Sequence, residues 1–379
     1  MITDLNPFIY SRPVMADDVI DRDEETRRLL QAAVGGHYVR LYAPRKYGKT
    51  SLLQRVLRDG ERDEGIVPVL VDLYGVLSLA DVTIRVERAY ARQLKGPFRT
   101  RVDDFLKSTG LGLSLGALGI GVRLQIERDV DPLPALHALL DLPLRLAADG
   151  GTRALVVFDE FQDVSKVAGM DAILRSHVQY QGDAASYVFS GSEPGLMREL
   201  FETAERPLYG QAVAMRLERL RDGDIAAYVV DRFRRSDRDV GDALEPLLRA
   251  AEGHPQRAML LAHRVWDELP RGEHADRHVW RRALERTLLE LAPEFEARWQ
   301  RYSVTEQKTL RALVSGDGSP YRERELERLG LAKSSAQQAL RKLVSRGEVE
   351  RADGRYAVVD PLFGRWAARL GAPVSAGEE

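Results

Sequence analysis

The sequence predicts an α/β protein built on a parallel sheet, and three observations support this fold class. Short apolar runs rich in β-branched residues occur along the first half of the chain, at 38–42, 67–73, 154–160 and 187–192. Helical patterns separate these runs, as expected for strands that are buried on both faces of a sheet. Several runs end in polar residues, at the sheet edge where ligands bind in folds of this class.

The composition is that of an ordinary globular protein with room for two or three domains. The chain has 379 residues, of which 44% are hydrophobic and 30% are charged. Its formal net charge is -2, so any affinity for nucleic acid must come from a local basic patch. The absence of cysteine excludes disulfide bonds, thiolate zinc sites and a cysteine nucleophile.

No stretch of the sequence has the pattern of a secretion signal or a membrane span. Residues 1–4 lack the basic and apolar regions of a signal peptide. The most apolar stretch, 110–122, is shorter than a bilayer requires and is interrupted by glycines. We therefore expect a cytoplasmic protein that does not interact with membranes.

The first apolar run leads into a predicted phosphate-binding loop. Residues 43–50 read Ala-Pro-Arg-Lys-Tyr-Gly-Lys-Thr, and a helical pattern follows at 51–57. In this order the loop N–H groups and the N-terminus of the helix point at phosphate oxygens. Gly48 has no side chain, so the backbone can come close to the phosphates. Lys49 is expected to contact the terminal phosphates and Thr50 to bind Mg²⁺. The predicted nucleotide-binding residues of the loop are Pro44, Arg45, Lys46, Tyr47, Gly48, Lys49, Thr50 and Ser51.

The loop departs from the usual G-x-x-x-x-G-K-[ST] pattern at its first position. Ala43 stands there in place of glycine, so the start of the loop must use a φ that alanine can adopt. The alternative interpretation is a chance Gly-Lys-Thr ahead of an amphipathic helix.

Two carboxylates, Asp159 and Glu160, end the third apolar run. Neighbouring residues of a strand point to opposite sides, so these acids are expected to have different roles. Asp159 suits the Mg²⁺ shell, and Glu160 suits the orientation or deprotonation of an attacking water as a catalytic base. The alternative is a strand that happens to end in a solvated acidic turn.

The fourth run is expected to lie between the strand that leads into the loop and the strand that ends in the carboxylates. Ser190 or Ser192 would then be close to a γ-phosphate, although Ser192 could instead cap the helix that begins near Pro194. Arg22 precedes a helical pattern that ends at Gly35. It is a candidate nucleotide contact, with a surface or capping role as the alternative.

Two further regions complete the first two thirds of the chain. Apolar residues alternate on both sides of Gly116-Ala117, which predicts a β-hairpin insertion at about 110–127. This hairpin could contact a partner, a neighbouring subunit or the core. The region 220–270 is wholly helical in pattern and contains a turn at 253–257.

The C-terminal region predicts three helices, at 305–314, 322–329 and 334–346, followed by a β-hairpin at 348–359. This order is typical of a winged helix. Positions 329–346 contain basic residues and no acid. The residues of the third helix expected to contact duplex DNA are Gln337, Gln338, Arg341, Lys342 and Arg346. A winged helix that serves only packing or protein contact is the alternative.

Taken together, these motifs resemble the archaeal-type ATPase family, which lies near the STAND and origin-recognition branches of the AAA+ class. The resemblance covers most of residues 15–270 and rests on the segments 43–53, 158–162, 190–192, 195–197, 207–210 and 253–255. It implies an AAA+-like core, a helical lid, commonly a C-terminal winged helix, and ATP as the ligand.

Two positions depart from the pattern of these families. Gln211 follows Tyr-Gly where the family often has a basic residue. Gln256 separates Pro255 from Arg257, and one residue turns a helical side chain by about 100°. The resemblance therefore carries over Pro255 and Arg257 as candidate nucleotide contacts, with Arg257 shifted from the usual sensor position.

The combined expectation is a P-loop AAA+-like core at 1–218, a helical lid at 219–295 and a winged-helix domain at 296–379. Such a protein would hydrolyse ATP with Mg²⁺ and couple its nucleotide state to DNA or a partner. Hydrolysis would be slow or partner-stimulated, because an arginine from a neighbour often completes such sites. A neighbouring subunit of a homo-oligomer could supply this arginine. The alternatives are a nucleotide-gated switch with little turnover and a DNA-binding regulator that uses the ATPase fold for assembly.

Overall fold

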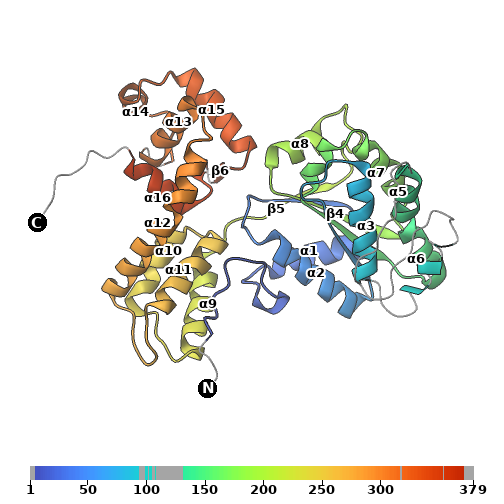
Figure 1. The fold of residues 1–379 in the computed structure, drawn as a ribbon, viewed down its shortest axis with the longest axis horizontal. Helices are drawn as coiled ribbons and strands as arrows, with labels where there is room; N and C mark the ends of the chain where they lie inside the picture. The colour runs from blue at the N-terminus through green and yellow to red at the C-terminus, as the bar shows by residue number, and fades with distance from the viewer. Residues whose placement is uncertain are drawn as a thin grey trace, which may run out of the picture. The chain divides into compact units, whose positions relative to one another are not determined.

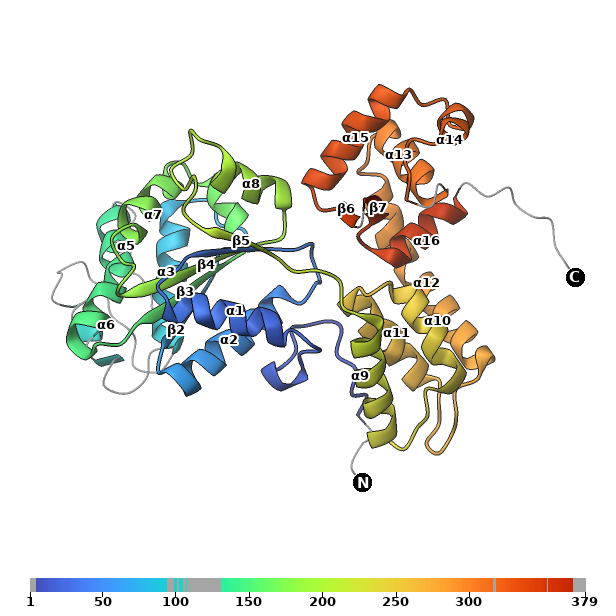
Figure 2. The same ribbon diagram turned by 180° about the vertical axis from the view of Figure 1, so that it is seen from behind.

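The protein is described here from a computed structural model (Figures 1 and 2). The structure describes residues 5–93, 99, 100, 102–104, 107, 131–315, 318–352 and 354–370. They form two compact units. The sheet unit consists of Met15–Ala43 and Lys49–Leu217. The helical unit consists of Met1–Val14, Pro44–Gly48 and Glu218–Glu379.

Five parallel strands form the sheet in the described part of the sheet unit, in the order β2-β3-β4-β1-β5. The strands are β1 (Val39–Tyr42), β2 (Val67–Asp72), β3 (Ala154–Asp159), β4 (Ala185–Gly191) and β5 (Val213–Arg216). The predicted parallel α/β sheet is confirmed, and β4 lies between β1 and β3 as expected. The predicted hairpin at 110–127 lies outside the described residues.

Helices cover both faces of this sheet, as Figure 2 shows. One face packs against α1 (Asp23–Val34) and α2 (Lys49–Glu64), which follow the short 3-10 helix η1 (Ala16–Asp18). The other face packs against α3 (Leu79–Gln93), α5 (Leu133–Leu140), α6 (Leu142–Gly150), η2 (Phe161–Lys166), α7 (Met170–Val178) and α8 (Pro194–Glu202). The alternation of β4 follows this division, because Ser186 bonds to α1 while Tyr187 belongs to the core of the opposite face.

An aromatic cluster lies at the carboxyl ends of β3 and β4. The rings of Phe158, Tyr187 and Phe189 stack side by side across the two strands, with centroid separations of 6.0–6.2 Å. Phe161 and Phe201 pack against Phe189 from η2 and α8. All five side chains are buried. This close packing holds the strand ends that follow Phe158 and Phe189 in a fixed position.

The described part of the helical unit contains eight α-helices after the sheet along the chain. They are α9 (Asp222–Arg235), α10 (Leu244–Ala251), α11 (Pro255–Asp267), α12 (Arg277–Trp299), α13 (Val304–Ser315), α14 (Glu323–Arg328), α15 (Lys333–Ser345) and α16 (Pro361–Arg369), with the 3-10 helix η3 (Gly241–Ala243). The antiparallel pair β6 (Val349–Ala352) and β7 (Arg355–Val358) lies between α15 and α16. The expected sequence of three helices and a hairpin is present from α13 to β7.

Helix α12 runs through position 295, where the sequence predicted a boundary between lid and winged helix. The division into three domains stays a prediction.

Within the described residues, no helix is both long and apolar enough to cross a membrane.

Candidate functional site

The phosphate-loop sequence follows β1, and its backbone has the conformation that its glycine permits. Gly48 has φ +84° and Lys46 has φ +67°, whereas Ala43 is not among the residues with positive φ. Ala43 is fully buried, and its N–H donates to the carbonyl of Gly191 at the end of β4. Alanine is therefore accommodated at the first position because the chain there continues the sheet pairing rather than turning.

Lys49 is the first residue of α2 and is 5% exposed. Its ammonium group donates to the carbonyl oxygen of Ala43 at 3.0 Å. The side chain thus connects the residue that follows the loop with the residue at its start. Ser51 is also buried in the first turn of this helix, while Arg45 and Lys46 are exposed.

Asp159, at the end of β3, accepts hydrogen bonds from side chains of two other segments of the sheet unit. Its Oδ2 accepts a hydrogen bond from the hydroxyl of Thr50 at 2.9 Å, and its Oδ1 accepts one from the hydroxyl of Ser190 at 2.8 Å. Burial raises the pKa of Asp159, while the bonds from Ser190 and Thr50 and the charge of Lys49 act in the opposite direction. A carboxylate and a hydroxyl in contact provide the hard oxygen donors that Mg²⁺ prefers.

No group of three or more histidines and acids that could hold a metal occurs in the described part of the chain. Thr50 and Asp159 offer two neighbouring protein oxygens, so a cation bound there would take its remaining ligands from water and phosphate. Mg²⁺ at nucleotide sites is bound in this way, through one or two protein groups plus substrate oxygens.

Glu160 follows Asp159 in a left-handed backbone conformation, with φ +51°. Its Oε2 accepts hydrogen bonds from Nε2 of Gln162 at 2.6 Å and from the hydroxyl of Ser192 at 2.7 Å. The N–H of Ser192 in turn donates to Oε1 of Gln162 at 3.2 Å. Gln162 and Ser192 are 1% and 2% exposed, so this carboxylate is held by two buried groups.

Sequence reasoning missed the contribution of Gln162 and gave Ser192 different roles. Helix α8 is preceded by Glu193, which makes no side-chain cap, and the Ser192 hydroxyl bonds to Glu160 instead. A signal was present for Gln162, since it is a polar residue two positions after an acid at the end of a buried strand. Its partner was not visible, because Ser192 lies thirty positions further along the chain.

Arg22 occupies the N-cap position of α1 with φ +77° and is 5% exposed. Its guanidinium bonds to Glu25 at 2.7 Å, and its carbonyl accepts hydrogen bonds from Thr26. In this structure Arg22 fixes the start of α1, and a contact with nucleotide stays a prediction.

The tip of the loop, Pro44–Gly48, belongs to the helical unit by its contacts. The side chain of Tyr47 is 1% exposed, and its hydroxyl donates to Oε1 of Glu350 on β6 at 2.7 Å. Its ring meets that of His254 edge-on at 5.1 Å. Arg219 donates to the same oxygen of Glu350 at 2.6 Å. This buried cluster leaves the carboxylate of Glu350 with both a phenol and a guanidinium as partners.

Pro255 and Arg257 lie in the first turn of α11. Arg257 is 1% exposed, and its Nε and Nη2 both donate to the carboxylate of Asp360, which also caps the N-terminus of α16. Burial alone would raise the pKa of Asp360, but the hydrogen bonds and charge of Arg257 lower it to about 2. Arg257 therefore anchors α16 in this structure, and its role as a phosphate sensor stays a prediction.

Four of the five candidate DNA contacts lie on the exposed side of α15, and the fifth, Arg346, is its exposed C-cap residue; the buried side consists of Ala336, Ala339, Leu340 and Leu343. One of the five is already paired, because Arg346 contacts the buried carboxylate of Glu306 at 3.0 Å. The predicted outward face is thus solvent-exposed.

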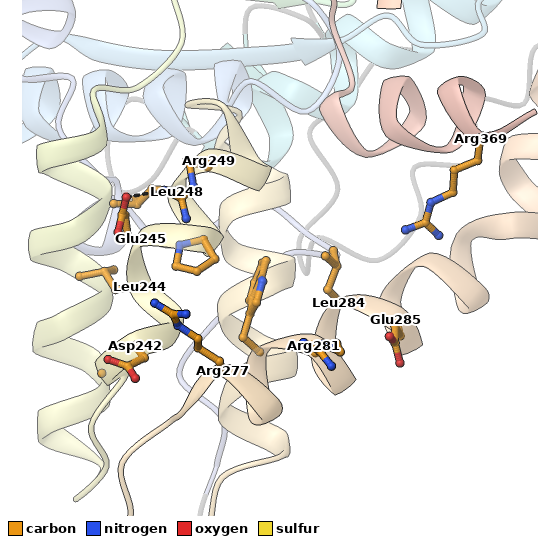
Figure 3. Close-up of a pocket in the computed structure, with 13 residues that line it drawn as sticks. Asp242, Leu244, Glu245, Leu248, Arg249, Arg277, Arg281, Leu284, Glu285 and Arg369 are labelled. Carbon is orange, nitrogen blue, oxygen red and sulfur yellow. Dashed lines mark hydrogen bonds and ion pairs between the residues drawn. The ribbon is translucent and has the colours of Figure 1, made fainter. Parts of the chain in front are cut away.

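Figure 3 shows a separate hollow in the helical unit, with a volume of about 870 Å³. Residues of η3, α10 and α12 line it, together with Arg369 of α16. None of the predicted site residues belongs to this lining.

No family model and no protein of curated function matches the sequence. Among solved structures, the Walker-type ATPase PABY2304 of Pyrococcus abyssi is similar with a TM-score of 0.70, 19% identity and coverage of 96% of this chain and 99% of that one. The ORC2 protein of Aeropyrum pernix, in its ADPNP–ADP complexes, gives a TM-score of 0.59 at 16% identity, covering 96% of both chains. The expected P-loop AAA+-like fold is confirmed, and at these identities the similarity establishes the fold.

We expect acid to destabilise the helical unit through His254. Burial lowers the pKa of His254 to about 3, whereas a histidine of the unfolded chain titrates near 6.5. Between these values the unfolded state binds a proton that the folded state does not, so stability falls as pH falls. The expected loss of unfolding free energy between pH 7 and pH 5 is about 2 kcal/mol.

Urea unfolding at the two pH values, followed by tryptophan fluorescence, measures this effect. The four tryptophans, at positions 266, 280, 299 and 366, all lie in the helical unit. His254→Gln keeps a hydrogen-bond acceptor and should flatten the pH dependence, while His278→Gln, an exposed control, should retain it. The same loss in His254→Gln as in the unmodified protein would contradict the assignment.

Proposed function

We propose that the protein is a Mg²⁺-dependent ATPase whose nucleotide state is coupled to DNA or partner binding through its C-terminal region. The observation that carries this proposal is the convergence of Thr50 and Ser190 on the carboxylate of Asp159, beside Lys49 and Glu160. These groups lie at the carboxyl ends of three adjacent strands, where ligands of open α/β sheets bind.

The residues divide into binding and chemical roles. The loop backbone at 44–51 and the ammonium of Lys49 would bind the phosphates. Thr50 and Asp159 would hold Mg²⁺, which when bound neutralises charge on the phosphate oxygens. Glu160 would accept a proton from the attacking water. Ser190 would keep the Asp159 carboxylate oriented, since its hydroxyl bonds to that group and is fully buried.

The hydrogen bonds of Arg257 support the proposal that hydrolysis is slow or partner-stimulated. Stabilisation of the transition state by an arginine accounts for a large share of the rate in enzymes of this type. The guanidinium of Arg257 is bonded on two sides to Asp360. In the proposed mechanism a second subunit or a protein partner supplies an arginine to the site.

A nucleotide-gated switch with little turnover is the second candidate function. The bond between Tyr47 of the loop and Glu350 of β6 favours it. This bond gives the loop's conformation a direct effect on the hairpin, so that binding alone could be the signal. In that case the C-terminal region would contact protein rather than DNA.

Lys49→Ala should abolish detectable ATP binding, because the phosphates would lose the cation that compensates their charge. Titration of a fluorescent ATP analogue into the full-length protein measures this, with an expected weakening of at least about 100-fold. Lys308→Ala, a lysine of α13 that donates to the carbonyl of Gly330, is the control. Micromolar affinity retained in Lys49→Ala would refute the phosphate-loop assignment.

Glu160→Gln preserves the shape of the side chain and removes the base. Phosphate release should fall by about 10² or more, the usual contribution of a positioned base, while ATP binding persists. Glu199→Gln, on the exposed side of α8, should leave the rate unchanged. Asp159→Asn should instead weaken the dependence on Mg²⁺. Turnover unaffected by Glu160→Gln would assign this residue a structural role.

DNA binding through α15 is supported by the exposure of Gln337, Gln338, Arg341 and Lys342 on one side of the helix. Fluorescence anisotropy of a labelled duplex with the full-length protein tests it at two or more salt concentrations. Lys342→Ala should lower the slope of log affinity against log salt by about one unit, since one phosphate contact is lost. Gln338→Ala should change preference among duplex sequences with little effect on the slope. No binding at low salt would exclude this surface as a DNA site.

A further inference from the structure

Three residues that follow β3 and β4, Glu160, Gln162 and Ser192, form a closed hydrogen-bonded ring. Gln162 Nε2 and the Ser192 hydroxyl both donate to Oε2 of Glu160, and the Ser192 N–H closes the ring by donating to Gln162 Oε1. We propose that Gln162 and Ser192 are positioning residues, which orient the Glu160 carboxylate for its reaction with water. This inference rests on the proposed hydrolytic function.

The two donors act on the same carboxylate oxygen. Among the described residues, none donates to the other oxygen, Oε1 of Glu160. A carboxylate fixed through one oxygen cannot rotate freely, so the second oxygen keeps one direction. The ring therefore defines which oxygen of Glu160 receives a proton. Orientation of this kind matters, because misplacement of a reacting group by about 1 Å can lower a rate by about 10²-fold.

The surroundings of the ring leave its members little freedom. Gln162 and Ser192 are almost completely buried. A Cβ at Gly191 would lie 2.9 Å from Gln162 Oε1 and 2.4 Å from the sulfur of Met197. The absence of a side chain at position 191 thus makes room for the amide of Gln162. Packing fixes the ring as well as hydrogen bonding.

Backbone geometry is consistent with a functional constraint at Glu160. Its left-handed φ of +51° is uncommon for a residue other than glycine, and such conformations cost of order 1–3 kcal/mol. The hydrogen-bonded ring holds the Glu160 side chain in the direction that this backbone conformation gives it. Ser192 has no competing role as a helix cap, since α8 begins without a side-chain cap.

The first measurement compares kcat, KM and nucleotide affinity of full-length Ser192→Ala and Gln162→Met with those of the unmodified protein. Each substitution removes one donor to Glu160 while keeping similar volume. We expect kcat to fall about 10-fold in each, with the affinity for a fluorescent ATP analogue changed by less than about twofold. Ser192→Thr, which restores the hydroxyl, should recover most of the rate. An unchanged kcat in both variants would overturn the proposal.

The decisive comparison introduces the same substitutions into Glu160→Gln. If the ring acts through the carboxylate, removal of a donor should cause no further loss once that carboxylate is absent. A loss of the same size in both backgrounds would show a structural effect and would overturn the proposal. Should Gln162→Met fail to fold, Ser192→Ala, which removes a single oxygen, carries the test.

The result also separates this inference from the proposed function on which it rests. If Glu160→Gln leaves hydrolysis unchanged, the catalytic role of Glu160 fails, and the positioning role fails with it. If Glu160→Gln lowers kcat while Ser192→Ala and Gln162→Met do not, the function stands and the positioning role alone is wrong.

Discussion

The buried carboxylate of Asp159 is the constraint on which the rest of the site depends. A carboxylate that is 6% exposed must have hydrogen-bond partners, because an uncompensated buried charge is expensive. Thr50 and Ser190 supply them, and each comes from a different segment. The strand order β3-β4-β1 places those segments next to one another. The aromatic cluster that contains Phe158 and Phe189 fixes the ends of β3 and β4. The same need for partners recurs at Glu160, Asp360 and Glu350, each of which joins elements that are distant in the chain.

Much of the fold could be predicted from the sequence because its strands are buried on both faces. Strands β1 to β4 appear as short apolar runs, and the acids at the end of β3 indicate the edge where ligands of open α/β sheets bind. Strand β5 has four residues, of which two are exposed, and so lacked this signal. Helix α12 has little amphipathic character and contains Pro293, so its continuity across position 295 was not evident from the sequence. The order of helices and hairpin at 305–359 was predictable, because segments with regularly spaced apolar residues alternate there with turn residues.

The site was predictable only as far as its motifs are local. Lys49, Thr50, Asp159 and Glu160 lie in contiguous stretches whose chemistry is evident from residue type. Three partners could not be inferred, because 32, 103 and 303 positions separate Ser192 from Glu160, Asp360 from Arg257 and Glu350 from Tyr47. Sequence analysis identifies a guanidinium or a phenol, but only the fold determines which carboxylate it meets.

The bond between Tyr47 and Glu350 has a consequence for how this chain can vary. Any ligand that requires another path for the loop tip must offset the loss of a buried hydrogen bond, which costs about 1–3 kcal/mol, or about five- to 150-fold in affinity. Substitutions in β6 that move Glu350 or remove its charge would therefore change which ligands the loop prefers. If the loop binds phosphate as proposed, natural variation in a hairpin more than 300 residues away offers a way to change that affinity while every residue of the loop is conserved.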